Sequence, residues 1–118
     1  MKSAEEETVA TTLMDRASLE RVAELFKVFG DATRLAIVQE LKGGALNVSE
    51  MVDRLGTTQA NVSKHLRIMH DARILQRERQ GTAVYYGIDD EFVFPLCRIV
   101  CEKLSRDGQA RGEMDFTI

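Results

Sequence analysis

The stretch of residues 47–88, NVSEMVDRLGTTQANVSKHLRIMHDARILQRERQGTAVYYGI, constrains the fold more than any other part of the chain. Asn47 followed three residues later by Glu50 predicts a capping box, in which each side chain accepts a backbone N–H of the first helical turn. Apolar residues then recur at helical spacing and define one buried face: Val48, Met51, Val52 and Leu55. Gly56 is expected to end this helix, because glycine adopts a left-handed backbone without a Cβ clash.

A second helix is predicted to start at Thr58, which can cap it. Its inner face is apolar, at Val62, Leu66 and Met69. Its outer face carries small, amide and basic side chains: Gln59, Ala60, Ser63, Lys64 and Arg67. Two short helices joined by a glycine-containing turn are typical of a helix-turn-helix, and these side chains can hydrogen-bond base edges or neutralise phosphates in a major groove. The second helix is therefore predicted to be a DNA recognition helix.

A β-hairpin is predicted next, and it is the only place where the sequence favours strands. Its strands, 74–79 and 82–88, flank a short turn at Gln80 and Gly81. Alternate side chains of the second strand are expected to face inward: Val84, Tyr86 and Ile88. A hairpin in this place completes a winged helix-turn-helix.

The basic side chains of this wing lie near its tip. Arg77 and Arg79 stand where a wing would meet the minor groove or the flanking phosphates. Tyr85 and Tyr86 are expected to pack and to make one hydroxyl hydrogen bond rather than to stack on bases.

The residues before this stretch predict two more helices. The first, within 13–29, has a broad apolar face: Leu19, Val22, Ala23, Phe26 and Phe29. Gly30 is expected to stop it, and Asp31 to cap the next helix, 32–42. That helix is predicted to bury Leu35, Ile37, Val38 and Leu41 before it ends at Gly43 and Gly44. Both helices are expected to build the core behind the recognition helix.

A final helix is predicted within 92–104, starting just before Pro95, because proline is tolerated only in the first turn. Its apolar surface is wide: Phe92, Leu96, Ile99, Val100 and Leu104. Two strongly apolar end helices exceed what one small core needs, so the sequence predicts a homodimer through the first and last helices. Two-fold symmetry would place two recognition helices on successive major grooves of a near-palindromic operator.

Composition and charge agree with a DNA-binding protein. A chain of 118 residues with 44% hydrophobic residues suits one domain, expected at 13–105 between an acidic flexible tail at 1–12 and a flexible tail at 106–118. The net charge is −3, yet residues 56–88 carry five basic and two acidic side chains, a local +3, which leaves −6 elsewhere. Such a distribution concentrates phosphate attraction on one surface. No apolar run could cross a bilayer and no secretory signal is visible, so a cytoplasmic protein without membrane contact is expected.

Three motifs carry a resemblance to a known family: Asp31-Ala32-Thr33-Arg34-Leu35, Val48-Ser49-Glu50-Met51 and Thr58 to Leu66. With the wing residues Arg79-Gln80-Gly81 and Val84-Tyr85-Tyr86, they make this chain similar to the ArsR/SmtB family of winged-helix repressors. The resemblance implies a dimeric repressor that leaves its operator when an effector binds. It also implies DNA contacts from the recognition helix and wing: Thr58, Gln59, Ala60, Asn61, Ser63, Lys64, His65, Arg67, Arg77, Arg79 and Gln80.

The metal sites of that family are not matched by this sequence. Asn47-Val48-Ser49 stands where some members have Cys-Val-Cys. In the final-helix region the chain offers Asp89, Glu91 and Glu102 but no histidine, a weak donor set for zinc, which favours nitrogen and sulfur ligands. No required cofactor is therefore expected, and no metal site is assigned.

Cys97 and Cys101 are the remaining effector candidates. Four residues apart on a helix, their Cβ atoms should lie roughly 5–6 Å apart, too far for an unstrained disulfide. Two thiolates at that distance can still bind a soft metal or metalloid, form a bond to a second chain across the dimer interface, or respond to reactive sulfur species or oxidants. The alternative is that both are small apolar residues packed in the dimer interface.

Other functions are weighed against this prediction. The chain has no glycine-rich phosphate loop, nucleophile elbow or His–carboxylate pair, so an enzyme is not expected. His65 is predicted to make a structural hydrogen bond or a phosphate contact, and His70 lies near a helix end that favours a cation. A repressor without a thiol effector, or a protein-interaction module that has lost DNA binding, remains as an alternative.

Overall fold

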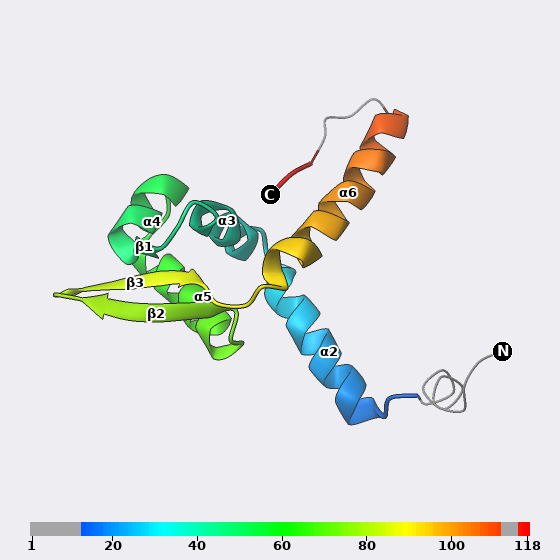
Figure 1. Cartoon of the computed structure of the whole chain (residues 1–118), viewed down its shortest axis with the longest axis horizontal. Coiled ribbons are helices and arrows are strands. Elements are labelled where there is room, and N and C mark those ends of the chain that lie inside the picture. Colours follow the sequence, from blue (N-terminus) through cyan, green and yellow to red (C-terminus); the bar gives the residue numbers. More distant parts are fainter. Residues whose placement is uncertain (1–12, 112–115) are drawn as a thin grey trace.

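The computed structural model describes residues 13–111 and 116–118, and within them it has the arrangement of a winged helix-turn-helix (Figure 1). The elements, in chain order, are α2 (Arg16–Phe29), α3 (Ala32–Leu41), β1 (Leu46–Asn47), α4 (Val48–Leu55), α5 (Gln59–Asp71), β2 (Leu75–Gln80), β3 (Ala83–Ile88) and α6 (Val93–Arg111). The mainly helical fold with a small wing is thus confirmed. The predicted tail at 1–12 lies outside the described residues.

The helix-turn-helix forms where its local signals predict it. Asn47 Oδ1 accepts the Glu50 N–H at 2.8 Å and Glu50 Oε1 accepts the Asn47 N–H at 3.1 Å, so the capping box is complete. Gly56 adopts φ 65° and donates its N–H to Val52 O at 3.0 Å, which ends α4. Thr58 Oγ1 then accepts the Asn61 N–H at 3.1 Å and starts α5.

The sheet has three strands in the order β1-β3-β2, where the sequence predicted only a hairpin. The additional strand β1 is two residues long and pairs antiparallel with β3 through Leu46–Tyr86 and Asn47–Tyr85. A strand this short carries no alternating pattern, and therefore the sequence gives no signal for it. The wing turns at Gly81, whose φ of 66° favours glycine.

The core of the single chain lies between the helix-turn-helix, α3, the base of the wing and the first turns of α6. Its fully buried side chains come from these elements: Ile37, Val38, Met51, Val62, Leu66, Met69, Ile74 and Val93. Contrary to the prediction that the first helix builds this core, α2 has no buried residue, and only Val28 and Phe29 at its end pack against the core. The Phe29 ring meets the Phe92 ring edge-to-face, with centroids 5.8 Å apart.

Helices α2 and α6 diverge from this core, α2 toward the lower right and α6 toward the upper right of Figure 1. Both expose large apolar side chains: Leu19, Val22, Leu25 and Phe26 on α2, and Ile99, Val100 and Leu104 on α6. Helix α6 ends at Arg111, later than the predicted tail boundary at 106. Residues 116–118 return toward it, because Phe116 N–H donates to Ser105 Oγ at 2.7 Å.

The end of α5 has a Schellman motif that the sequence did not predict. Arg73 N–H donates to His70 O and Ile74 N–H donates to Met69 O, both at 3.0 Å. This places Arg73 in the left-handed conformation, at φ 61°, and makes it the one non-glycine residue with a positive φ among the described residues. The motif turns the chain from the recognition helix directly into β2.

Candidate nucleic-acid interface

The outer face of α5 is exposed, as expected for a recognition helix. Six of the predicted contact residues have exposed side chains at the start and middle of the helix: Thr58, Gln59, Ala60, Ser63, Lys64 and Arg67. Their opposite face supplies buried apolar side chains to the core at Val62, Leu66 and Met69. Helix α5 is therefore held by its inner face while amide, hydroxyl and basic groups remain available on the outer one.

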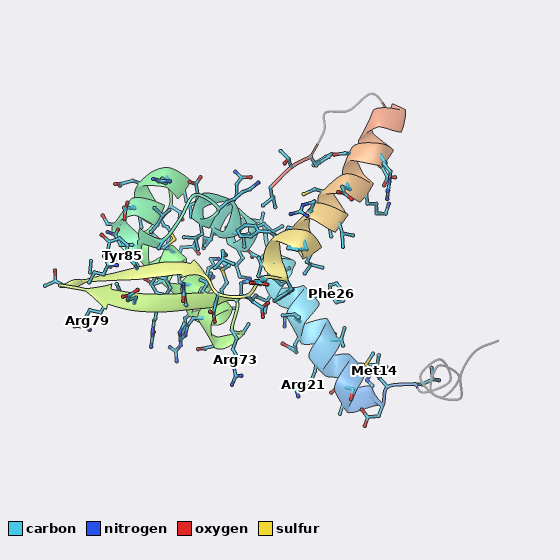
Figure 2. All side chains as sticks on the ribbon, viewed as in Figure 1. Met14, Arg21, Phe26, Arg73, Arg79 and Tyr85 are labelled. Carbon is cyan, nitrogen blue, oxygen red and sulfur yellow. The ribbon has the colours of Figure 1, made fainter. Side chains whose placement is uncertain are left out.

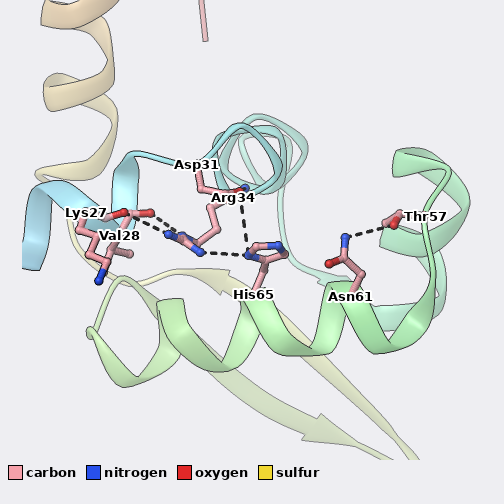
Figure 3. Close-up of polar contacts among 7 residues, drawn as sticks. All are labelled: Lys27, Val28, Asp31, Arg34, Thr57, Asn61 and His65. Carbon is pink, nitrogen blue, oxygen red and sulfur yellow. Dashed lines mark hydrogen bonds and ion pairs between the residues drawn. The ribbon is translucent and has the colours of Figure 1, made fainter.

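Asn61 differs from its exposed neighbours, because its side chain is half-buried and bonded inside the motif. Asn61 Nδ2 donates to Thr57 Oγ1 at 3.1 Å, and its backbone N–H is bound by Thr58 (Figure 3). Asn61 therefore joins the first turn of α5 to Thr57 in the turn that precedes the helix. Its role as a DNA contact stays a prediction.

His65, predicted as a DNA contact, instead lies on the inner side of α5 with only 5% of its surface exposed. Its Nδ1 lies 3.1 Å from Arg34 Nη1 on α3 and 4.0 Å from Asp31 Oδ1 (Figure 3). A side chain this buried cannot reach a phosphate on the outer face. Of the two roles predicted for His65, the structure contains the structural hydrogen bond.

Burial lowers the pKa of His65, and the positive charges of Lys64 and Arg34 lower it further, while Asp31 opposes them. The guanidinium of Arg34 can only donate hydrogen bonds, so His65 Nδ1 must accept. His65 is therefore the neutral imidazole with its proton on Nε2. The pKa of Asp31 is also lowered, mainly because its carboxylate accepts the Arg34 backbone N–H at 3.0 Å.

The wing presents its basic residues to solvent. Arg77, Arg79 and Gln80 are exposed on β2, and Figure 2 shows Arg79 near the tip. Tyr86 packs against the core, as predicted, and Tyr85 is half-buried. The wing therefore offers guanidinium groups rather than free aromatic faces to a nucleic acid.

Arg73 is an exposed basic residue that the prediction of contacts omitted. It stands at the Schellman turn between α5 and β2, and in Figure 2 it projects from the same side of the molecule as Arg79. The signal in the sequence was the run of basic residues across this turn. Its αL conformation carries no sequence signature without glycine, so its direction was not predictable.

The two cysteines line an apolar cavity of about 260 Å³, away from α5. Its walls come from the end of α2, from α6 and from residues 116–118, including Phe26, Phe29 and Val100. Both thiols are free; Cys97 is 5% exposed and Cys101 is half-buried. Burial raises the pKa of the Cys97 thiol, and the neighbouring Cys101 adds to this effect. Cys97 is therefore held in its neutral thiol form at neutral pH.

Two features that would indicate other classes of function are absent from the described residues. Within residues 13–111 and 116–118, no group of three or more His, Cys, Asp or Glu side chains is placed to hold a metal ion. In the same part of the chain, none of the helices has the length and apolar character needed to span a bilayer.

A recognition helix with a free polar face, followed by a basic wing, defines the class of winged helix-turn-helix DNA-binding regulators. Comparison with known proteins agrees. Residues 31–77 match the family described as "Bacterial regulatory protein, arsR family". The arsenical resistance operon repressor of Bacillus subtilis is 34% identical over 82% of this chain and 90% of its own length.

Solved structures give the same result. The crystal structure of the transcriptional repressor PagR of Bacillus anthracis is 39% identical, with a TM-score of 0.62 over 73% of this chain and 99% of that one. A homodimeric winged helix-turn-helix DNA-binding domain from Mycobacterium bovis is 26% identical, with a TM-score of 0.67 over 79% of this chain and 91% of that one. The chain belongs to the ArsR family and is a DNA-binding transcriptional repressor.

Proposed function

We propose that this repressor binds a near-palindromic operator as a homodimer in the cytoplasm, with α5 in the major groove and the wing over the flanking backbone. The observation that supports this most directly is the exposed set Gln59, Ser63 and Lys64 on a helix whose other face is buried. Gln59 and Ser63 are the proposed base contacts, while Lys64, Arg67, Arg77 and Arg79 bind phosphates or guanine.

The homodimer is supported by the apolar faces of α2 and α6. Phe26 and Ile99, whose exposed fractions are 60% and 64%, would be covered by a second copy. A closed two-fold interface uses the same patch on both chains, which would leave both α5 helices free. The homodimeric relative from Mycobacterium bovis has the same fold.

Cys97 and Cys101 are the proposed effector site. Both thiols line one cavity beside the faces proposed for the dimer interface, so a modification there would change how α2 and α6 pack. The effector class is a metalloid, a soft metal, or a reactive sulfur species or oxidant. Each of these binds or reacts with the thiolate form, so the Cys97 thiol would release its proton as the effector reacts. Arsenite is a natural first ligand to test, given the name of the Bacillus subtilis relative.

The experiment has two stages. First, the affinity for a duplex selected from a random pool, and for random duplex, is measured by fluorescence anisotropy at several salt concentrations. A DNA-binding repressor should show a steep negative slope of log affinity against log salt. A protein-interaction module would bind neither duplex.

In the second stage, the selected complex is treated with arsenite, metal salts, polysulfide or peroxide. Release by one of them in the native protein but not in the Cys97→Ser/Cys101→Ser variant supports the thiol site. Equal release from both proteins, or from neither, indicates a repressor without a thiol effector.

A further inference from the structure

Arg34 of α3 contacts two other elements, α2 and α5, through one guanidinium group (Figure 3). Its Nε donates to Val28 O at 2.6 Å and its Nη2 donates to Lys27 O at 3.0 Å, both at the end of α2. Its Nη1 donates to His65 Nδ1 at 3.1 Å on α5. The side chain itself belongs to α3, so a single residue joins the helix proposed for dimerisation to the helix proposed for DNA recognition.

The electrostatics of this group suit the end of a helix. The last carbonyls of α2 carry the negative end of its dipole, so a cation that donates hydrogen bonds to them is favourable. Lys27 O also accepts the Gly30 N–H at 3.1 Å, and Arg34 donates one hydrogen bond to each of Lys27 O and Val28 O. Lysine cannot reproduce this arrangement, because its ammonium group lacks the planar fork that reaches three acceptors at once. The requirement is therefore for arginine specifically and not only for positive charge.

His65 transmits this link to the DNA-binding face. It follows Ser63 and Lys64 directly on α5, and its buried ring is the point where α5 is bonded to Arg34. We propose that Arg34 is a positioning residue that sets the orientation of α5 relative to α2, and with it the spacing of the two recognition helices in the dimer. The proposal rests on the proposed dimeric function.

The link also depends on the protonation of His65. Protonation would place a proton on Nδ1, remove the acceptor and bring a second positive charge against Arg34, with Lys64 nearby on the same helix. Asp31, at 4.0 Å, would offset part of this repulsion. Because burial lowers the pKa of His65, the link persists at neutral pH and is lost only as the pH falls below the ordinary range of histidine.

The test measures spacing discrimination. The selected near-palindromic duplex is compared with the same duplex carrying one inserted base pair between its half-sites, which rotates one half-site by roughly 35°. We expect the native protein to lose at least about tenfold in affinity on insertion. For Arg34→Lys and His65→Leu we expect weaker binding to the selected duplex, by about tenfold, and a penalty for the insertion below about threefold.

Controls separate positioning from loss of folding. Arg54→Lys is the matched control, because Arg54 is an exposed arginine of α4 whose ion pair with Glu40 of α3, at 3.4 Å, involves neither α2 nor α5. Affinity for random duplex should be unchanged in all variants, since it depends on phosphate contacts alone. In His65→Asn, Oδ1 replaces Nδ1 as an acceptor that does not titrate, so binding should be kept and the loss of binding expected as the pH falls below the ordinary range of histidine should disappear.

Each outcome decides the matter. If the native protein shows no penalty for the insertion, the proposed symmetric dimer fails, whatever Arg34 does. If the native protein discriminates and Arg34→Lys and His65→Leu discriminate equally well, the positioning role is wrong. The same holds if these variants lose selected and random duplex in equal proportion, or if His65 in the native protein titrates as a cation at neutral pH by NMR.

Discussion

The helix-turn-helix and the pair of helices α2 and α6 differ in how far their apolar side chains are buried within the single chain. In α4 and α5 the caps are complete and the apolar faces are buried within one chain. In α2 no residue is buried, and α6 exposes Ile99, Val100 and Leu104. The helix-turn-helix is therefore stabilised by contacts within its own chain. Helices α2 and α6 instead expose an apolar surface of the kind that a second protein surface covers.

The largest effect on stability is expected from a change to the buried face of the helix-turn-helix. Leu66 is 1% exposed on the inner face of α5, so Leu66→Ala should reduce the free energy of unfolding by about 2–5 kcal/mol. Denaturant unfolding followed by circular dichroism measures this. Leu19→Ala, at a position on α2 with 48% exposure, is the matched control and should change the stability of the monomer by less than about 1 kcal/mol. Equal losses would contradict the contrast between the regions.

A change to the second region should separate assembly from folding. Ile99→Asp places a charge on the exposed apolar face of α6, which costs little in a monomer but is strongly unfavourable in a dry interface. We expect a monomer by light scattering, unchanged helical content, and loss of at least about 2 kcal/mol in operator binding. A variant that remains dimeric would show that α6 is not in the interface.

Within the recognition face, base contact and phosphate contact should be separable. Gln59→Ala should relax the preference at one base pair, costing about 1–3 kcal/mol there, and should leave random duplex binding unchanged. Lys64→Ala should instead weaken binding to all sequences and reduce the salt slope by about 1. Binding selections and salt titrations distinguish the two. An unchanged sequence preference in Gln59→Ala would remove Gln59 from the base contacts.

The smallest effect should come from Arg73, which lies in the turn between α5 and β2. Arg73→Gly relieves a left-handed conformation at φ 61° and should raise the free energy of unfolding by about 1 kcal/mol. The same change removes a positive charge, so DNA affinity should fall while stability rises. Thermal unfolding and anisotropy on the same samples test this. Arg73→Lys keeps the charge and the strain, and should change neither property much.

The sequence predicted those features whose signals are local. The capping box of Asn47, the end of α4 at Gly56 and the turn at Gly81 all depend on residues a few positions apart. The exposed face of α5 followed from helical spacing alone. These features include most of the fold and the outer face of the proposed interface.

What could not be predicted depends on contacts between distant segments. The burial of His65 is set by Arg34, which is 31 residues away, and β1 exists only because β3 returns beside it. Helical spacing placed His65 at the edge of the inner face of α5. At such a position the exposure of the side chain depends on which residue of another element packs against it, here Arg34. The weak participation of α2 in the core had no local signal either, since a helix that packs inward and one that packs on a second chain have the same periodicity.

The two-residue strand β1 has a consequence for how the wing can vary. Asn47 both caps α4 and pairs with Tyr85, so the hairpin is tied to the helix-turn-helix as far as the middle of β3. Beyond that pair, the outer part of the hairpin is held by β2–β3 pairing alone. Extra residues inserted at Gln80 and Gly81 would therefore lengthen the reach of the wing along the DNA backbone without disturbing α5. Insertions of the same size at Leu46 would displace the whole motif.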